Sequence, residues 1–258
     1  MTARILAIAN QKGGVGKTTT TVNLATALAA FKKKTLLIDL DPQGNASTGL
    51  SFHPQGRQIG TYEVVLGDVD IGQAVVATEI PDLWLLPASP DLSGAEIELV
   101  NQTEREYRLK AALEPVSSYY DYILIDCPPA LGLLTLNALT TAGNVLIPLQ
   151  CEYYALEGLS QLIKTIMRIR QSLNSKLEIL GIVLTMFDKR SGLSSQVAED
   201  VRQTLGDKVL KTVIPRNVKI SEAPSHGKPA LLYDINCQGS QAYIKLAAEI
   251  LKRKWSSV

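Results

Sequence analysis

The sequence predicts an α/β protein of the doubly wound class, in which a mostly parallel sheet carries helices on both faces. Short runs rich in Ile, Leu and Val alternate along the chain with longer helical patterns, as in repeated strand–helix units with right-handed crossovers. Most of these apolar runs are continuous rather than alternating, which is typical of strands buried on both faces of a parallel sheet. A glycine-rich loop joins the first run to the first helical pattern.

Seven apolar runs are expected to form strands, and longer periodic stretches are expected to form helices. The expected strands are Arg4–Ala9, Thr35–Leu40, Leu83–Pro87, Tyr122–Cys127, Asn144–Leu149, Leu180–Met186 and Val209–Ile214. The expected helices are Lys17–Phe31, Leu131–Ala142, Ala155–Leu173, Ser194–Leu205 and Gln241–Lys254. No long linker, repeat or low-complexity segment interrupts this order, so we expect residues 1–258 to form a single domain.

The overall charge argues against a strongly polyanion-binding protein, but its distribution is uneven. The formal net charge is only +1. Residues 186–258 nevertheless carry 12 lysines and arginines against 7 acidic residues, whereas the rest of the chain has 14 against 18. A mildly basic C-terminal third is a weak indication of a polyanionic partner, and solvated helix faces explain it more simply.

Cysteine usage and hydropathy both indicate a cytoplasmic protein. The cysteines at positions 127, 151 and 237 are odd in number, far apart and without a CxxC pair, which argues against a disulfide framework or a zinc site. The apolar run at the N-terminus is too short for a signal peptide. Residues 127–151 contain no charge but are interrupted by prolines and glycines, whereas a membrane span needs about 20 consecutive apolar residues. We therefore interpret that stretch as core.

The segment NQKGGVGKTT, residues 10–19, has the composition of a phosphate-binding loop. It resembles the pattern GxxxxGKT, although Gln11 occupies the position of the first glycine. Glycines let the backbone curl so that N–H groups approach phosphate oxygens, and the start of the following helix adds a partial positive charge. We therefore expect the phosphate-loop NTPase type of fold. The residues expected to bind the nucleotide here are Gly13, Gly14, Val15, Gly16, Lys17, Thr18 and Thr19.

Charged residues at strand ends should complete this site, because ligands bind outside the C-terminal ends of the strands in such sheets. Lys17 can reach the β- and γ-phosphates, and the Thr18 hydroxyl can ligate Mg²⁺. Asp126 ends an apolar run, where a carboxylate could hold the water shell of that ion or only cap a turn. Asp41 could orient the attacking water, whereas Asp39 lies inside the strand pattern and is expected to be structural. The expected cofactors are ATP and Mg²⁺.

Five segments together resemble the ParA/Soj family of DNA-partitioning ATPases. They are KGGVGKT (12–18), DLDPQGN (39–45), IDCPP (125–129), QCEYYALEGLSQL (150–162) and IPRNVKISEAPSHGKP (214–229). The wider group has a deviant Walker A loop and includes the division-site protein MinD. The resemblance implies a slow ATPase that forms a homodimer around two ATP molecules and, as that dimer, binds double-stranded DNA non-specifically to drive chromosome or plasmid partitioning. It also implies a ParB-like centromere-binding partner that stimulates hydrolysis, and a nucleoid-associated location.

The resemblance also assigns roles to residues whose chemistry alone does not reveal them. Lys12, the first lysine of KGG, is expected to reach across the dimer to the phosphates bound by the other subunit, as an arginine finger does. Pro215 and Asn217 are expected to border the adenine. Because no helix-turn-helix or zinc finger is evident, DNA contacts should be made to phosphates. The residues expected to make these contacts are Arg190, Arg216, Lys219 and Lys228, with possible help from the tail Lys252–Lys254.

Three other functions remain as alternatives. A MinD-like membrane-positioning ATPase would dock a C-terminal amphipathic helix on lipid, and the tail places Ile250, Leu251 and Trp255 beside Lys252–Lys254. A terminal helix packed on the core explains that tail equally well, and DLDPQGN and the IPRN segment favour the partitioning branch. A redox role like that of the nitrogenase iron protein would need a different cysteine arrangement, and a small-molecule kinase would need an acceptor site. The sequence does not name the cargo or the partner.

Overall fold

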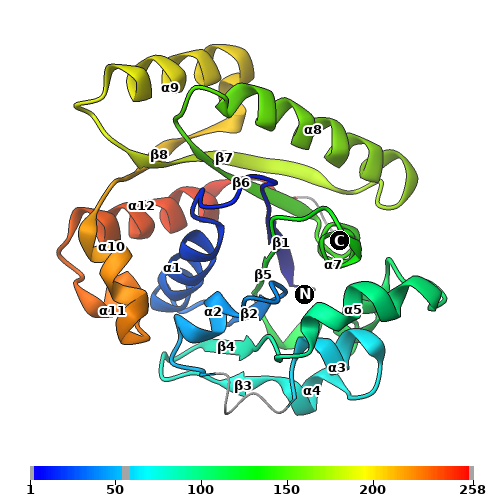
Figure 1. Cartoon of the computed structure of the whole chain (residues 1–258). Coiled ribbons are helices and arrows are strands. Elements are labelled where there is room, and N and C mark those ends of the chain that lie inside the picture. The colour runs from blue at the N-terminus through cyan, green and yellow to red at the C-terminus, as the bar shows by residue number, and fades with distance from the viewer. Residues whose placement is uncertain (1–2, 54–58, 256–258) are drawn as a thin grey trace.

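A single sheet of eight strands forms the centre of the computed structural model, which describes residues 3–53 and 59–255. The strand order is β3-β4-β2-β5-β1-β6-β7-β8, and every neighbouring pair is parallel except β3 and β4 (Figure 1). The strands are β1 (Arg4–Ile8), β2 (Thr35–Asp39), β3 (Val76–Ala77), β4 (Leu83–Leu86), β5 (Tyr122–Asp126), β6 (Asn144–Gln150), β7 (Glu178–Phe187) and β8 (Val209–Pro215). The predicted fold class is confirmed, and all seven expected strands are present within a few residues. The ends of the predicted domain, residues 1–2 and 256–258, lie outside the described residues.

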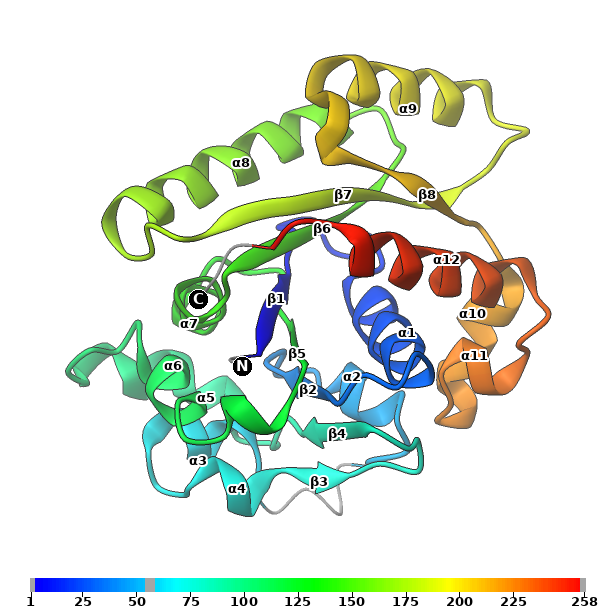
Figure 2. The same ribbon diagram turned by 180° about the vertical axis from the view of Figure 1, so that it is seen from behind.

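Helices cover both faces of this sheet, as the views from the front and the back show (Figures 1 and 2). The longer ones are α1 (Lys17–Ala30), α7 (Leu133–Thr141), α8 (Ala155–Ser172), α9 (Gly192–Leu205) and α12 (Gln238–Lys252). The shorter ones are α2 (Asn45–Thr48), α3 (Thr61–Leu66), α4 (Ile71–Ala74), α5 (Leu92–Glu98), α6 (Arg108–Leu113), α10 (Val218–Glu222) and α11 (Ala230–Tyr233). The sequence predicted the five longer helices but none of the shorter ones.

Two apolar cores lie on opposite faces of the sheet, and β1 contributes to both. Side chains alternate along a strand, so Leu6 and Ile8 join the core beneath α1, α11 and α12. Ile5 and Ala7 join the other core, which is covered by α3 to α9. Strands buried in this way are apolar at most positions, which is why their sequences read as continuous runs.

The C-terminal helix packs on the sheet rather than extending from the molecule. The side chains of Tyr243, Leu246 and Ile250 on α12 are buried in the core shared with α1. Trp255 then lies edge-on against Tyr122, with 5.3 Å between the ring centroids. This arrangement supports the interpretation of the tail as a core-packed helix. Among the described residues, no helix is long and apolar enough to cross a membrane.

Strand β8 forms one edge of the sheet, and side chains form hydrogen bonds with some of its backbone groups. The Glu249 carboxylate accepts hydrogen bonds from the backbone N–H groups of Lys211 and Thr212, each at 2.8 Å. The Arg202 guanidinium donates to the carbonyl oxygen of Leu210 at 3.2 Å. Covering an edge in this way hinders pairing with another strand, and it leaves the side chains of β8 to face a groove along α12.

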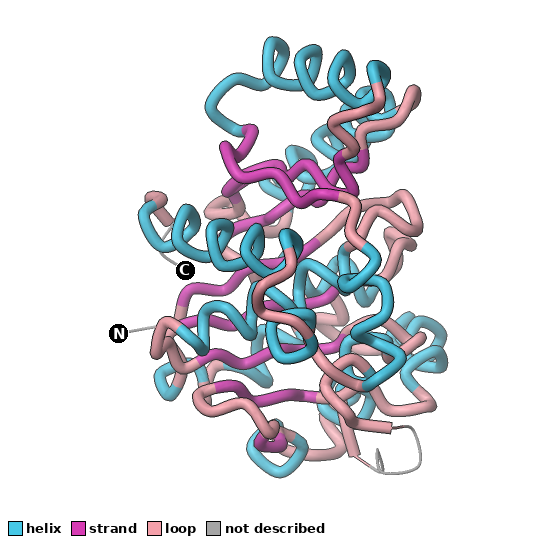
Figure 3. Tube along the Cα trace, turned by 90° about the vertical axis from the view of Figure 1, so that its left-hand side faces the viewer, coloured by secondary structure: helices cyan, strands magenta, loops and turns pink. Residues whose placement is uncertain are grey.

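The strand register brings the predicted site residues to one edge of the sheet. Asp126 of β5 lies opposite Ile8 of β1 on one side and opposite Asp39 of β2 on the other. The loops that follow these strands therefore leave the sheet at one edge, where the parallel strands end. Figure 3 shows the layer of strands from the side. The candidate site lies at this edge.

Candidate nucleotide-binding site

A pocket of about 460 Å³ opens where the strands β1, β2, β5, β7 and β8 end. Most of the glycine loop lines it, together with Asp41 from the loop after β2 and Pro129 from the loop after β5. Pro215 and Asn217 line the same pocket. The structure thus brings together the phosphate loop, the proposed water-orienting carboxylate and the proposed adenine-binding segment, which are up to about 200 residues apart in the sequence.

The glycine loop has the backbone conformation that its composition predicts. Gly14 has φ 74° and Gly16 has φ 86°, a left-handed region that glycine enters without strain. A Cβ atom built on Gly13 or Gly14 would meet no atom within 4 Å. The backbone of the loop is therefore open on this side, where a phosphate could approach its N–H groups. Helix α1 begins at Lys17 and directs its N-terminus toward this loop.

Two buried polar residues that the sequence analysis missed hold the loop in place. The Asn10 side chain accepts a hydrogen bond from the Lys12 backbone N–H at 3.0 Å and donates to the Pro148 carbonyl at 2.7 Å. On the other side, the Thr185 hydroxyl donates to the Val15 carbonyl at 2.8 Å. Their partners lie 138 and 170 residues away in the sequence, so no local pattern could have identified them.

Lys17 is the buried cation of the pocket. It is only 7% exposed, and its Nζ lies 3.4 Å from the Lys12 carbonyl oxygen. Burial lowers its pKa, while the negative charges of Asp126 and Asp41 oppose this effect. An ammonium group held in a partly dehydrated site is strongly attracted to an incoming polyphosphate, because little water screens the charges.

Asp126 carries an unpaired oxygen at the base of the same site. Its Oδ1 accepts a hydrogen bond from the Thr21 hydroxyl at 2.9 Å, whereas its Oδ2 is buried with no partner among the described residues. Burial is the main reason that its pKa is raised, and the nearby Asp39 carboxylate adds to the shift. The nearby hydroxyls of Thr18 and Thr21 partly oppose this rise in the Asp126 pKa. A buried carboxylate oxygen that has no hydrogen-bond partner destabilises the fold unless a cation binds it.

These groups fit Mg²⁺, although the described residues form no protein cage for a metal. Among the described residues, no three acidic, histidine or cysteine side chains form a metal-binding cluster. Mg²⁺ in nucleotide sites uses one or two protein oxygens, substrate phosphates and water. Thr18 and Asp126 supply oxygens of this kind beside the loop.

The two aspartates after β2 have different environments. The Asp39 carboxylate is fully buried, and its Oδ2 accepts from the Ser47 backbone N–H at 2.7 Å and the Ser47 hydroxyl at 2.6 Å. These bonds tie β2 to α2, as expected for a structural residue. Asp41 lines the pocket. Its Oδ1 accepts a hydrogen bond from the Gln43 backbone N–H at 3.0 Å, and no other described residue is found to donate to this carboxylate. Asp41 is therefore the carboxylate that faces the nucleotide site.

Lys12 lies outside the lining of its own pocket. Its Nζ is 2.5 Å from Glu152 Oε2, and the two side chains are 48% and 46% exposed. Tyr153 and Tyr154 follow directly, 77% and 69% exposed, with their rings edge to face at 5.0 Å. Tyrosines are enriched in protein interfaces, so this exposed surface beside the loop has the composition of an interface.

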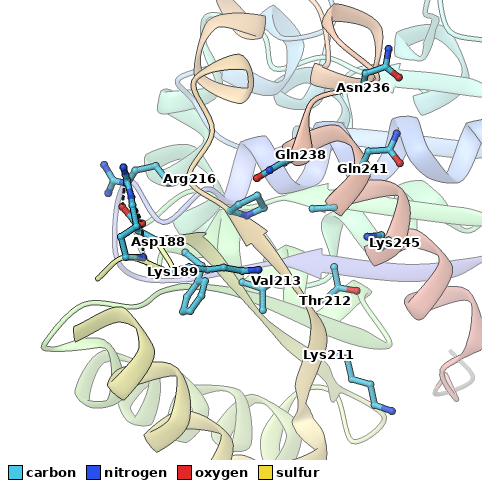
Figure 4. Close-up of a pocket in the computed structure, with 14 residues that line it drawn as sticks. Asp188, Lys189, Lys211, Thr212, Val213, Arg216, Asn236, Gln238, Gln241 and Lys245 are labelled. Atoms are coloured by element: carbon cyan, nitrogen blue, oxygen red, sulfur yellow. Dashed lines mark hydrogen bonds and ion pairs between the residues drawn. The ribbon is translucent and has the colours of Figure 1, made fainter. Parts of the chain in front are cut away.

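The four cations predicted to bind DNA do not form one cluster. Arg190 and Arg216 line a second cavity, of about 920 Å³, between β8 and α12 (Figure 4). Lys228 instead lines a depression on the other side of the nucleotide pocket. Lys219 pairs with Glu222 at 3.0 Å. In the tail, Arg253 donates to the carbonyl oxygens of residues 180 and 207. We call the second cavity the β8–α12 groove, defined by the side chains within residues 187–190, 211–216 and 236–245 that line it.

Comparisons with known proteins show the family and the fold to which the chain is similar. The family described as an AAA domain matches residues 3–179. The chromosome partitioning protein ParA of Caulobacter vibrioides is 59% identical over 97% of this chain and 95% of its own length. The sporulation initiation inhibitor protein Soj of Bacillus subtilis is 54% identical over 96% and 98% of the two chains. A structure titled cobyrinic acid a,c-diamide synthase from Mycobacterium smegmatis, with bound ATP analog and magnesium, superposes with a TM-score of 0.85 at 40% identity, covering 97% and 95%.

Proposed function

Because the chain belongs to the ParA/Soj family of chromosome-partitioning ATPases, we propose that it is an ATP-driven switch that dimerises with ATP and then binds DNA. The observation that carries the proposal is the pocket that Lys17 and Asp41 line with the glycine loop, with the half-paired Asp126 buried close to Lys17. These groups are a cation for the phosphates, a carboxylate for the attacking water and an oxygen for the metal.

In this proposal the loop and Lys17 bind the phosphates of ATP, and the wall formed by Pro215 and Asn217 borders the adenine. The N–H groups of residues 13–19 and the N-terminus of α1 stabilise the negative charge. Asn10 and Thr185 keep the loop in shape before ATP arrives, which lowers the entropic cost of binding. The M. smegmatis protein, solved with an ATP analog and magnesium, supports this assignment.

Thr18 and Asp126 would hold Mg²⁺, and Asp41 would orient water for attack on the γ-phosphate. When bound, Mg²⁺ neutralises charge on the phosphate oxygens. The Asp41 carboxylate accepts the hydrogen bond that fixes the water in line with the bond that breaks. Hydrolysis then yields ADP and phosphate. A slow basal rate suits a switch whose hydrolysis is stimulated by a ParB-like centromere-binding protein.

Lys12 would act in the dimer rather than in the monomer. In the single chain it is held by Glu152 outside its own pocket. An ATP molecule facing a second subunit presents four negative charges, which attract an additional cation across the interface. The exposed Tyr153 and Tyr154 beside it supply apolar surface for the same contact. ATP would thus be part of the interface between the two subunits.

Binding of the dimer to DNA would be sequence-independent. Pairing two subunits doubles the number of cations that face one duplex, and affinity for the DNA backbone rises steeply with the number of phosphates contacted. Of the four predicted contacts, Arg190 and Arg216 are the best supported, because both line the β8–α12 groove. This activity would place the protein on the nucleoid in the cytoplasm.

Light scattering with and without ATP, combined with an assay of released phosphate, tests the proposal. We expect a monomer without nucleotide, a dimer with ATP and Mg²⁺, and slow hydrolysis that Asp41→Ala abolishes while the dimer persists. A chain that remains monomeric with ATP in both the wild type and the Asp41→Ala variant would rule out the switch.

A further inference from the structure

Helix α7 follows the loop that contributes Pro129 to the nucleotide pocket, and a residue of another helix caps its start. The N-cap residue of α7 is Gly132, which has no side chain to accept a hydrogen bond from the first N–H groups of the helix. Glu96 of α5, which packs in the same core as α7 (Figure 1), accepts these bonds instead. Its Oε2 accepts from the Leu133 N–H at 2.8 Å, and its Oε1 accepts from the Leu134 N–H at 3.1 Å.

The missing side chain at position 132 makes room for this remote cap. Gly132 has φ −90° and ψ −167°, an extended conformation that any residue can adopt, so the backbone itself does not require glycine. A Cβ atom built there would instead overlap both carboxylate oxygens of Glu96. The glycine therefore admits the carboxylate of α5 in the place where a local Ser, Thr or Asp cap would otherwise lie. A negative charge at this end of a helix is also favoured by the helix dipole.

The loop between β5 and α7 has little freedom between its two ends. It begins after Asp126, which is paired with strands on both sides. Near its other end, the Thr135 hydroxyl donates to the Ala130 carbonyl at 2.6 Å and ties the loop to the first turn of α7. Pro128 and Pro129 lie between these points, and each has a φ that its ring restricts. A movement of the first turn of α7 is therefore passed on to Pro129 in the pocket.

The body of α7 is held independently of Glu96. The buried Asn137 side chain accepts from the Leu109 N–H at 3.0 Å and donates to the Arg105 carbonyl at 2.7 Å. Loss of the Glu96 carboxylate should therefore leave the helix in place and release only its first turn. The consequence should be confined to the loop after β5.

We propose that Glu96 is a positioning residue for ATP hydrolysis, which acts by capping α7 and thereby holding the loop after β5 against the nucleotide pocket. The inference rests on the proposed ATPase activity and concerns a residue that is not among those lining the pocket. Pro129 and Asp41 line that pocket together, so the loop limits the space in which the attacking water is held. Lys17 and the glycine loop do not depend on this cap, and ATP binding should persist when hydrolysis slows.

The test compares ATP affinity with single-turnover hydrolysis in the full-length protein with Mg²⁺. Glu96→Ala should leave the affinity unchanged in isothermal titration calorimetry. It should slow hydrolysis on the order of tenfold, because a misplacement of about 1 Å can cost about 100-fold and a frayed turn still samples the correct position part of the time. Glu98→Ala is the matched control on the same helix, since the Glu98 carboxylate accepts from the surface hydroxyl of Tyr62 at 2.8 Å, and it should hydrolyse ATP at the wild-type rate.

Glu96→Ala/Gly132→Asp separates a positioning role from a merely structural one. Removal of the Glu96 side chain frees the space that a side chain at position 132 needs, and aspartate is a preferred N-cap residue. The double variant should therefore recover most of the lost rate. Gly132→Asp alone should be slow, because its side chain collides with Glu96. A rescue of one slow variant by a second slow variant is expected only if the cap itself sets the rate.

Thermal unfolding of each variant identifies a folding defect, and Glu96→Gln, which keeps one acceptor oxygen, replaces Glu96→Ala if the latter does not fold. Glu96→Gln should hydrolyse ATP at an intermediate rate. If the folded variant hydrolyses ATP as fast as Glu98→Ala, or if the double variant is no faster than Glu96→Ala, the role of Glu96 is wrong while the proposed function stands. If the wild type itself does not hydrolyse ATP, the proposed function is wrong.

Discussion

The nucleotide pocket and the β8–α12 groove share one wall but are built in opposite ways. Pro215 and Arg216 line both cavities. In the pocket, the charged groups are buried and hydrogen-bonded: Lys17 donates to the carbonyl oxygen of Lys12, and Asp126 accepts from the hydroxyl of Thr21. In the groove, the charged groups are at the ends of long, solvent-exposed side chains, such as that of Arg190.

This difference determines how each region should respond to change. Electrostatic interactions in a buried, preorganised site are strong and little affected by salt, because water is excluded. Interactions of exposed charges are individually weak, additive and strongly screened. Single substitutions should therefore act nearly as all-or-none changes in the pocket and as graded, salt-dependent changes in the groove.

Lys17→Ala should have the largest effect of a single substitution in the pocket. A hydrogen bond to a charged group contributes about 1.5–3 kcal/mol, so the loss of contacts with two phosphates should weaken ATP binding by roughly 100-fold or more. Isothermal titration calorimetry measures this directly. Lys33→Ala, three residues beyond the C-terminal end of α1, is the control. Equal ATP affinity in the two variants would mean that Lys17 does not contact the phosphates.

Asp41→Ala should slow hydrolysis without preventing ATP binding. A positioned group that accepts a proton typically accelerates a reaction by about 10²–10⁴, and a loss in single-turnover rate of at least about 100-fold is expected. The matched control is Asp39→Asn, which should lower thermal stability because it disturbs the bonds to Ser47. A single-turnover rate equal to that of the wild type would remove Asp41 from the mechanism.

Lys12→Ala should bind ATP close to normally but fail to dimerise with it. The ion pair with Glu152 is exposed and contributes little to the stability of the monomer, so the defect should be confined to assembly. Glu152→Gln releases Lys12 and should leave dimerisation intact or strengthen it. Light scattering with ATP compares the two variants, and a normal dimer in Lys12→Ala would refute a role across the interface.

The buried carboxylates should give the nucleotide-free protein a small dependence of stability on pH. Burial raises the pKa values of Asp126 and Asp39 in the folded state, so their contribution is fully present below the unfolded pKa of about 3.9 and declines as pH rises through the folded values. Between about pH 5 and pH 8 we expect Tm to fall by at least roughly 3 °C, since one unit of pKa difference corresponds to about 1.4 kcal/mol and 1 kcal/mol to about 2–4 °C at this size. Asp126→Asn should flatten the curve, and an equal fall in that variant would contradict the assignment.

The structure agrees with the sequence-based predictions for elements whose burial leaves a clear pattern in the sequence. The seven longer strands were predictable because parallel strands buried on both faces are continuous apolar runs. Apart from β4, the elements between β2 and β5 were not predictable, because β3 has only two residues and the helices α3 to α6 are at most seven residues long, too short to show a clear period.

The candidate site divides in the same way. The glycine loop was predictable because its chemistry lies in glycine backbone and in a lysine of fixed spacing. Asn10 and Thr185 were not predictable, since their partners are contributed by other strands. Glu96 escaped prediction for a similar reason: the backbone N–H groups that it caps lie on α7, 37 and 38 residues further along the chain, and only the folded chain brings them together.

The most direct test of the central claim, that nucleotide in the pocket controls DNA binding, is a comparison of ATP with ADP. Fluorescence anisotropy of the Asp41→Ala variant on two duplexes of unrelated sequence would be recorded at one salt concentration with each nucleotide and Mg²⁺. The account predicts equal, tight binding to both duplexes with ATP and at least about tenfold weaker binding with ADP, because only the ATP dimer joins two cationic grooves on one DNA. Equal affinity with ATP and ADP, or no binding with either, would contradict it.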